Sequence, residues 1–170
     1  MIYINIGSNI NSIKGDRFYN IKKSIELIRN RKIKILKISK VYETPSYPNE
    51  KDPKFLNICV AIKSQLSPEL LIKVFSSIEK KLQRTKEFKN QPRTCDIDII
   101  DYRRKIINSK KLTIPHPRAH LRNFVLYPLK EISPEWVHPI FNKKIEFLIK
   151  KLSFKLRNEI TRLNESVIVV

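Results

Sequence analysis

Four short segments of the chain show the pattern expected of β-strands with at least one buried face. They are residues 2–6, 32–41 and 55–63 and the run of acids and isoleucines that begins at Asp96. Two longer segments repeat their apolar residues every three or four positions, which predicts amphipathic helices at residues 16–30 and from Pro68 to near Arg84. The predicted order along the chain is strand, helix, strand, strand, helix, strand.

Both predicted helices have a recognisable start. Asp16 stands where it can cap the first helix. Ser67, Pro68 and Glu69 open the second, since serine is a preferred cap, proline suits the first helical position and an acid suits the first turn. The residues expected on the buried side of the second helix are Leu70, Leu71, Val74, Phe75, Ile78 and Leu82.

This order of elements is the ferredoxin-like arrangement, in which an antiparallel sheet carries two helices on one face. Helical patterns return at residues 122–132 and 143–156, and the segment 157–170 has no clear pattern. Neither an internal repeat nor a linker divides the chain. The sequence predicts a single α+β domain over residues 1–170, with a ferredoxin-like βαββαβ core and additional C-terminal helices.

The 170 residues carry a formal net charge of +19, from 35 lysines and arginines against 16 acids. Such a charge fits nucleic acids or anionic small molecules as partners, but the lysines are spread over the whole chain, which indicates a compositional bias. Only 2 glycines are present, so neither the glycine-rich loop of P-loop proteins nor that of dinucleotide-binding folds can be built. The charge still favours the encounter with a polyanion such as ATP.

Cysteine use and hydropathy predict a cytoplasmic protein. Cys59 and Cys95 have no paired spacing, and the first residues lack the character of a secretory signal, so both thiols are expected to be free. No apolar run approaches the roughly 20 residues of a membrane span. Three polar residues are given no function: His120 and His138 are expected at the surface, and Glu79 is expected to be a solvated charge.

The most informative stretch is Pro-Arg-Thr-Cys-Asp-Ile-Asp-Ile-Ile at residues 92–100. On a strand, Asp96 and Asp98 point to the same side, roughly 7 Å apart, and repel each other unless water or a cation separates them. A bare pair of this kind is more often a solvated strand face. Here the pair is surrounded by cationic residues, namely Arg84, Lys86, Lys89 and Arg93 before it and His116, Arg118, His120 and Arg122 after it. Acids that hold a divalent cation, beside cations that hold phosphate, are typical of chemistry on a nucleoside triphosphate.

Several short motifs occur in a fixed order along the chain. They are Ile-Gly-Ser-Asn at 6–9, Tyr-Glu-Thr-Pro at 42–45, Phe-Leu-Asn at 55–57, Pro-Arg-Thr-Cys-Asp-Ile-Asp-Ile at 92–99, Ile-Pro-His-Pro at 114–117 and Arg-Asn-Phe-Val-Leu-Tyr-Pro-Leu at 122–129. In these motifs the chain resembles the 6-hydroxymethyl-7,8-dihydropterin pyrophosphokinases of folate biosynthesis, from residue 2 to about residue 139. The resemblance implies a ferredoxin-like fold. It also implies transfer of the β,γ-pyrophosphoryl group of ATP to the hydroxymethyl oxygen of the pterin, with release of AMP.

The resemblance further implies which residues bind the nucleotide. Asp96 and Asp98 would hold two Mg²⁺ ions, which neutralise the phosphates. Arg84 and Arg93 would act with the two acids in catalysis, because a forked guanidinium suits bidentate contact with phosphate. The residues implied for ATP, the co-substrate, are Ser76, Arg84, Lys86, Arg93, Ile99, His116 and Arg122.

For the pterin, the resemblance implies a flat ring held between two aromatic side chains. Phe55 and Phe124 would stack on its two faces, and Asn57 and Thr44 would form hydrogen bonds with its polar edge. Gly7 would let the backbone pass close to the ring. The full set implied for the pterin is Gly7, Thr44, Pro45, Tyr47, Phe55, Asn57, Asp96 and Phe124.

The chain departs from the pattern of the family in one loop. Asn90 stands where a tryptophan commonly seals the closed site, and Lys86 stands where a second arginine is common. We expect these changes to affect closure and affinity more than reaction type.

Two alternatives are a paralogue with weakened catalysis and a basic RNA-binding module of the same topology, although the strands at 2–6 and 55–63 lack the aromatic signature of such modules. The expected protein is a monomer that acts on small molecules and has neither a nucleic acid nor a membrane as partner.

Overall fold

The computed structural model describes residues 1–84, 91–109, 112–165 and 167. Its first half contains β1 (Ile2–Ser8), α1 (Arg17–Arg29), β2 (Lys34–Ile38), β3 (Tyr42–Thr44), β4 (Phe55–Lys63), α2 (Pro68–Lys81) and β5 (Asp96–Tyr102). Its second half contains β6 (Ile107–Asn108), β7 (Thr113–Ile114), a 3₁₀ turn (Ala119–Leu121), α3 (Asn123–Ile132), α4 (Ile145–Lys151), α5 (Phe154–Asn158) and β8 (Thr161–Arg162).

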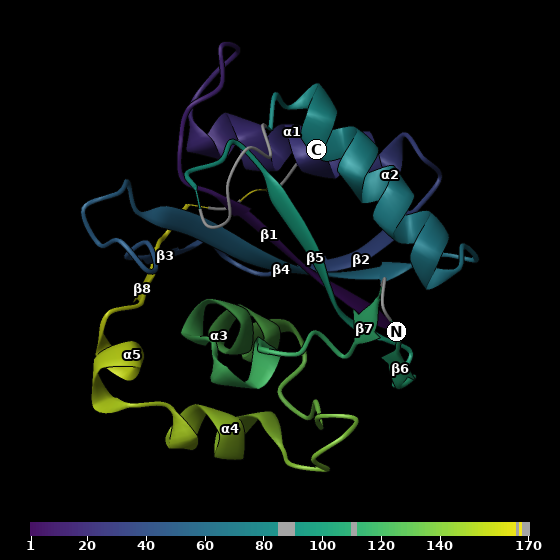
Figure 1. Ribbon diagram of the computed structural model, residues 1–170, viewed down its shortest axis with the longest axis vertical. Helices are drawn as coiled ribbons and strands as arrows, with labels where there is room; N and C mark the ends of the chain where they lie inside the picture. The colour runs from purple at the N-terminus through teal and green to yellow at the C-terminus, as the bar shows by residue number, and fades with distance from the viewer. Residues whose placement is uncertain (85–90, 110–111, 166, 168–170) are drawn as a thin grey trace.

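The main sheet is antiparallel and has the strand order β5-β1-β4-β3-β8, with β2 also paired to β4. Figure 1 shows α1 and α2 together on one side of this sheet and α3 on the other, with α4 beyond α3. The predicted α+β fold with a ferredoxin-like core is confirmed, and so are additional helices after it. The third helix α3 closes the second face of the sheet.

Alternation along the strands divides the interior into two cores. In β1, Ile2, Ile4 and Ile6 face α1 and α2, where they join a large cluster of buried isoleucines. The alternate residues face α3, whose Leu126 and Leu129 belong to a second, smaller cluster. Full burial of such a side chain contributes roughly 1.5–3 kcal/mol, so both faces stabilise the sheet.

The predicted starts of both helices in the core are confirmed. Asp16 accepts a hydrogen bond from the Tyr19 backbone N–H at 2.8 Å, and Ser67 accepts one from the Leu70 N–H at 3.3 Å. The prediction for Leu70 itself is wrong, because its side chain is 47% exposed. It lies in the first turn, outside the stripe that Leu71 and the following apolar residues bury against the sheet.

Three boundaries differ from the prediction. The single strand predicted at residues 32–41 is the shorter β2, and the separate strand β3 follows it, starting at Tyr42. The single helix predicted at 143–156 is two helices, since the backbone at Leu152 is extended and Ser153 caps a new helix. The unassigned tail contributes β8, which pairs with β3.

The prediction of surface positions for the histidines is wrong for His138, which is 2% exposed. Its ring stacks on Phe141 with centroids 4.4 Å apart, and it meets the edges of Trp136 and His120. Its Nδ1 accepts hydrogen bonds from the backbone N–H groups of Ile140 and Phe141. Desolvation, and then the proximity of His120, lower the pKa of His138 to about 4, so the ring is neutral.

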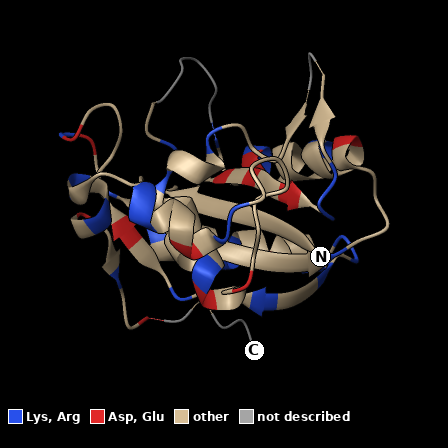
Figure 2. Cartoon of the chain, turned by 90° about the horizontal axis from the view of Figure 1, so that it is seen from below, with Lys and Arg blue, Asp and Glu red and all other residues tan. Residues whose placement is uncertain are grey.

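Both cysteines are buried with free thiols, as predicted. Within the described ranges, no helix is both long and apolar enough to cross a bilayer. Lysines and arginines lie on helices, strands and loops on several sides of the molecule, as Figure 2 shows, which agrees with a positive charge spread along the chain.

Candidate active site

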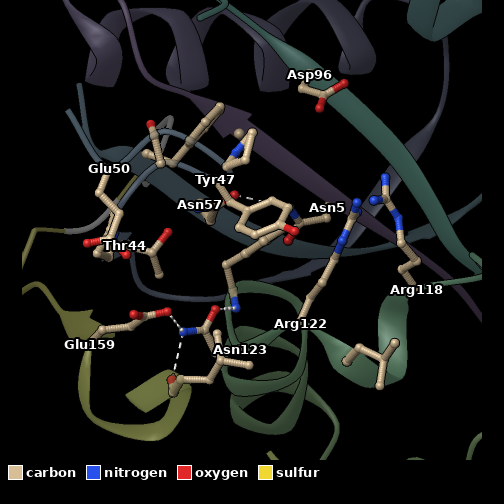
Figure 3. A pocket seen from close by; sticks show the side chains of 18 of the residues that line it. Asn5, Thr44, Tyr47, Glu50, Asn57, Asp96, Arg118, Arg122, Asn123 and Glu159 are labelled. Atoms are coloured by element: carbon tan, nitrogen blue, oxygen red, sulfur yellow. Dashed lines mark hydrogen bonds between the residues drawn. The ribbon is translucent and has the colours of Figure 1, made fainter. Parts of the chain in front are cut away.

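A cavity of about 510 Å³ lies on the α3 side of the sheet. Its walls come from β1 and β4, the loop after β3, the acidic end of β5, the start of α3 and the helix α5. Figure 3 shows side chains from these segments pointing into the same space. A volume of this size is typical of sites for small molecules.

All eight residues that the resemblance implied for the pterin line this cavity. They are Gly7, Thr44, Pro45, Tyr47, Phe55, Asn57, Asp96 and Phe124. Strand register explains part of this agreement, since Gly7 in the central strand pairs with Asn57 on one side and with Asp96 on the other. Three segments far apart in sequence thereby present the same face to the cavity.

The polar groups at the bottom of the cavity are incompletely bonded. Thr44 Oγ1 and one end of the Asn57 side-chain amide are buried without a hydrogen-bond partner among residues 1–84, 91–109, 112–165 and 167. A Cβ atom at Gly7 would lie 2.9 Å from the Asn57 side chain and 3.6 Å from the ring of Phe55. Because buried polar groups are costly when unpaired, these atoms are suited to a ligand with its own hydrogen-bonding edge.

Two aromatic rings border the same space. The Arg93 guanidinium lies 5.2 Å from the centre of the Phe55 ring, and the Arg122 guanidinium lies 5.3 Å from that of Phe124. Each phenylalanine is therefore in contact with a cation at one edge of the cavity. A flat apolar body with a charged group attached would find both kinds of partner here.

The acidic pair lies on the face that the alternation predicted. Ile97 and Ile99 enter the core under α1 and α2, while Asp96 and Asp98 line the cavity on the opposite face of β5. Asp96 forms ion pairs with Arg84 at 2.7 Å and with Arg93 at 2.8 Å. Desolvation, and then the charge of Asp96, raise the pKa of Asp98 to about 7. Two carboxylates so close are unfavourable without a cation, which fits the expected chemistry of a metal site.

His116 and Arg122 approach Asp98 from the other side. His116 Nε2 and Arg122 Nη1 each lie 3.9 Å from Asp98 Oδ2. Desolvation, and then the charges of Arg122 and Arg118, lower the pKa of His116 to about 4. Since the Arg118 backbone N–H donates to His116 Nδ1, the neutral ring carries its proton on Nε2, the atom that faces Asp98. In Figure 3, Arg118 and Arg122 point from beside α3 toward the strand that carries Asp96.

Glu79 is not the solvated charge that the sequence predicted. Its side chain is 4% exposed, and it forms an ion pair with Arg84. It also accepts the backbone N–H of Ile97 at 2.9 Å, at the start of β5. Glu79 therefore links the end of α2 to the acidic strand and orients Arg84 toward Asp96. An acid five residues before an arginine at a helix end was the only signal of this in the sequence.

Of the seven residues implied for ATP, Arg93 and Arg122 line the cavity, and Arg84 and His116 lie beside its acidic pair. The other three are not brought to the cavity or are not described. Ser76 lies on α2, and Ile99 points into the core that α1 and α2 cover. Their proposed contact with the nucleotide stays a prediction. Lys86 and Asn90 lie outside the described residues, so the loop changes noted above are not tested.

The C-terminal segment supplies lining residues that the sequence did not reveal, because no motif covers it. Lys155, Leu156 and Glu159 line the cavity from α5 and its C-cap. Asn123 Nδ2 donates to the Leu156 carbonyl at 2.7 Å and to Glu159 at 3.4 Å, as drawn in Figure 3. Lys155 forms an ion pair with Glu50 at 2.5 Å, so α5 also contacts the loop before β4.

Residues 3–134, more than half of the chain, match the family described as "7,8-dihydro-6-hydroxymethylpterin-pyrophosphokinase (HPPK)". The chain belongs to this family. Two curated relatives named "2-amino-4-hydroxy-6-hydroxymethyldihydropteridine pyrophosphokinase" support the assignment. The one from Aquifex aeolicus is 39% identical over 145 residues, which cover 85% of this chain and 88% of the relative. The one from Bacillus subtilis is 40% identical over 131 residues, which cover 76% of each.

Longer proteins also contain a segment like this HPPK-family chain. It is 40% identical over 151 residues to "Folic acid synthesis protein fol1" of Pneumocystis carinii, covering 89% of this chain but only a fifth (20%) of that protein. Among solved structures, "Plasmodium falciparum HPPK-DHPS wild type with Pteroate" has a TM-score of 0.70 at 15% identity. That likeness covers 95% of this chain and 47% of the other, and it shows a shared fold.

Proposed function

We propose that this chain transfers pyrophosphate from ATP to 6-hydroxymethyl-7,8-dihydropterin, giving AMP and the pterin diphosphate in folate biosynthesis. Its membership of the HPPK family and the names of its bacterial relatives support this activity. The observation that carries it is the juxtaposition of an aromatic-bordered cavity and an acidic pair. The acceptor ring and the triphosphate would meet at Asp96 and Asp98, which line that cavity.

The pterin would lie between Phe55 and Phe124, in offset stacking with both rings. Its polar edge would satisfy Thr44 Oγ1 and the free end of the Asn57 amide, two of the buried groups that have no partner within the described part of the chain. The hydroxymethyl group would then point toward Asp96 and Asp98, on the neighbouring strand. This arrangement holds the acceptor oxygen close to the phosphates, which is a major part of catalysis in phosphoryl transfer.

Asp96 and Asp98 would hold the two Mg²⁺ ions. Among the residues whose side chains are described, no group of three or more potential ligands is present, so this part of the chain would supply the two carboxylates. This donor set fits Mg²⁺, which often binds one or two carboxylates together with phosphate oxygens. When bound, the ions would neutralise the triphosphate and increase the acidity of the acceptor hydroxyl.

The cations around the acidic pair would hold the triphosphate. Arg84 and Arg93, which pair with Asp96 here, would turn from it to phosphate once a metal occupies the carboxylate, with Arg84 still held by Glu79. Arg122 would add a guanidinium from the opposite wall, and neutral His116 would donate a hydrogen bond through Nε2–H. All four groups would stabilise the charge that develops in the transition state.

A coupled assay tests the activity. Purified protein should release AMP from ATP in the presence of Mg²⁺ only when the hydroxymethyl dihydropterin is added, with one pterin diphosphate formed per AMP. Removal of Mg²⁺ with a chelator should stop both products. AMP release without the pterin, or no product under any of these conditions, would refute the proposal.

The RNA-binding alternative is not favoured, because α3 covers the sheet face on which such modules stack bases.

We further propose one pyrophosphokinase domain over residues 1–170, acting as a monomer in the cytoplasm. The sheet shared by both cores supports one domain. The oligomeric state and the location stay predictions, to be tested by light scattering and by fractionation of cells.

A further inference from the structure

Asn5 is a buried polar residue that the sequence did not single out. It lies in the middle of β1, is 5% exposed and lines the cavity on the same face of the sheet as Gly7. A buried amide requires partners for both of its ends. Its hydrogen bonds therefore reveal how it acts on the cavity.

One end of the Asn5 amide lies between two backbone carbonyls. The carbonyl oxygen of Ile58 is 3.0 Å away, and that of Phe124 is 3.2 Å away. Both are acceptors, so the NH₂ group of Asn5 must occupy this end and donate to both. The carbonyl oxygen of Asn5 then faces the side-chain amide of Asn57 at 3.3 Å.

The helix α3 explains why the Phe124 carbonyl is available. In a regular helix that carbonyl would accept the N–H of the residue four positions later, which here is Pro128. Proline has no N–H, so the carbonyl lacks its usual partner. The Asn5 NH₂ group supplies one, and this fixes the orientation of the Asn5 amide.

The orientation of Asn5 determines that of Asn57. Because Asn5 presents an oxygen, Asn57 must turn its NH₂ group toward Asn5. The other end of the Asn57 amide, which has no partner among the residues the structure describes, is then its carbonyl oxygen. Asn57 lines the cavity next to Asn5, as Figure 3 shows, and its unpartnered end is buried in that wall, so the group it can present to a ligand is an acceptor.

We propose that Asn5 is a specificity-determining residue that makes Asn57 a hydrogen-bond acceptor toward the ligand. The site then selects a heterocycle with an N–H donor on that edge, such as the amino-pyrimidinone side of a pterin. This inference rests on the proposed function, because it concerns recognition of the same substrate. Asn5 acts through Asn57 and is a positioning residue.

The test compares two ligands in two variants. Binding of 6-hydroxymethyl pterin, and of an analogue with hydrogen in place of the 2-amino group, is measured by fluorescence titration in the presence of Mg²⁺ and a nonhydrolysable ATP analogue. In Asn5→Ala, Asn57 is free to turn, so the preference for the amino-bearing ligand should fall about tenfold, the equivalent of one lost hydrogen bond. Asn5→Ser, which is too short to reach both partners, should show the same loss if Asn5→Ala folds poorly.

Tyr3→Phe is the matched control. Tyr3 lies two residues away on the same face of β1, and its hydroxyl bonds Ser133 Oγ at 2.8 Å outside the cavity lining. This variant should keep the preference of the unmodified protein even if its melting temperature falls. An unchanged preference in both Asn5 variants would overturn the inference. The proposed pyrophosphokinase function would still stand. Failure of the unmodified protein to bind the pterin would instead refute the proposed function, and the inference with it.

Discussion

At the scale of single residues, the acidic strand holds two carboxylates in different surroundings. Asp96 is neutralised by Arg84 and Arg93, whereas the pKa of Asp98 is raised to about 7 by desolvation and by the charge of Asp96. The two carboxylates therefore differ in their cations, since Asp96 has close ion pairs at 2.7 and 2.8 Å while His116 and Arg122 lie 3.9 Å from Asp98. This asymmetry leads to a prediction that separates catalysis from stability.

Asp98→Asn should abolish turnover while leaving the fold intact or slightly more stable. The amide removes a negative charge that burial and Asp96 disfavour, but it no longer binds a divalent cation well. We expect AMP formation to fall by at least about 10²–10³-fold, the usual loss when a group that stabilises transition-state charge is removed. The product assay and thermal melting without Mg²⁺ measure the two effects, and near-normal turnover would show that Asp98 does not hold the metal.

Gly7→Ala should weaken pterin binding without changing the backbone. The Cβ would lie 2.9 Å from the Asn57 side chain, so the Asn57 amide must shift from the position in which it meets the ligand. We expect the dissociation constant for the pterin to rise about tenfold, the equivalent of one disturbed buried hydrogen bond. Titration with a nonhydrolysable ATP analogue provides the control, because its affinity should be unchanged. Equal pterin affinity in the variant would contradict the assignment of Asn57 to the ligand.

At the scale of elements, alternation and capping signals predicted most of the core, since these depend on local chemistry. β4 and the start of α2 were predicted at their observed residues, and the Asp96 face of β5 was assigned correctly. The break at Leu152, the buried side chain of Glu79 and the contact of α5 with the cavity were missed. Burial of Glu79 and the contact of α5 depend on packing between segments distant in sequence, which the spacing of apolar residues does not reveal. The break at Leu152 has a local signal, the cap Ser153, which the apolar spacing of residues 143–156 outweighed.

The attachment of α5 yields a prediction at this scale. Asn123→Ala removes the donor that holds the Leu156 carbonyl at 2.7 Å, so the α5 wall should loosen and the KM for the pterin should rise several-fold. Lys130→Ala is the control, since Lys130 lies on α3 outside the cavity lining. Its ion pair with Glu146 joins side chains that are 42% and 59% exposed, and such pairs contribute little. Steady-state kinetics that show equal effects for both variants would refute a structural role for Asn123 at this wall.

At the scale of the whole molecule, two cores share one sheet and only one of them contains the cavity. The larger core lies under α1 and α2. On the α3 side, some residues pack in the smaller core and others, such as Phe124, line the cavity. The HPPK-family chain thus uses one face for stability and divides the other between packing and binding. The aromatic cluster around His138 holds the connection between α3 and α4 on this second face.

This cluster predicts a stability that depends on pH. The pKa of His138 is about 4 in the folded state and near 6.5 when unfolded, so between these values the unfolded chain binds more protons. The free energy of unfolding should therefore fall as the pH is lowered from 6.5 to 4, by about 3 kcal/mol for His138, the free-energy equivalent of the gap between the two pKa values. His138→Asn should flatten this part of the curve. Denaturant titrations at several pH values measure it, and parallel curves for both proteins would contradict the prediction.

The proline in α3 has a consequence beyond its own helix. Pro128 has no N–H, so the Phe124 oxygen lacks its usual partner in α3. A hydrogen missing from the helix thereby decides whether the sheet presents a donor or an acceptor to the ligand. In Pro128→Ala the backbone N–H of residue 128 could donate to the Phe124 carbonyl. Asn5 would then share this acceptor with the helix. Ligand choice in this enzyme would then change through a position that the ligand never touches.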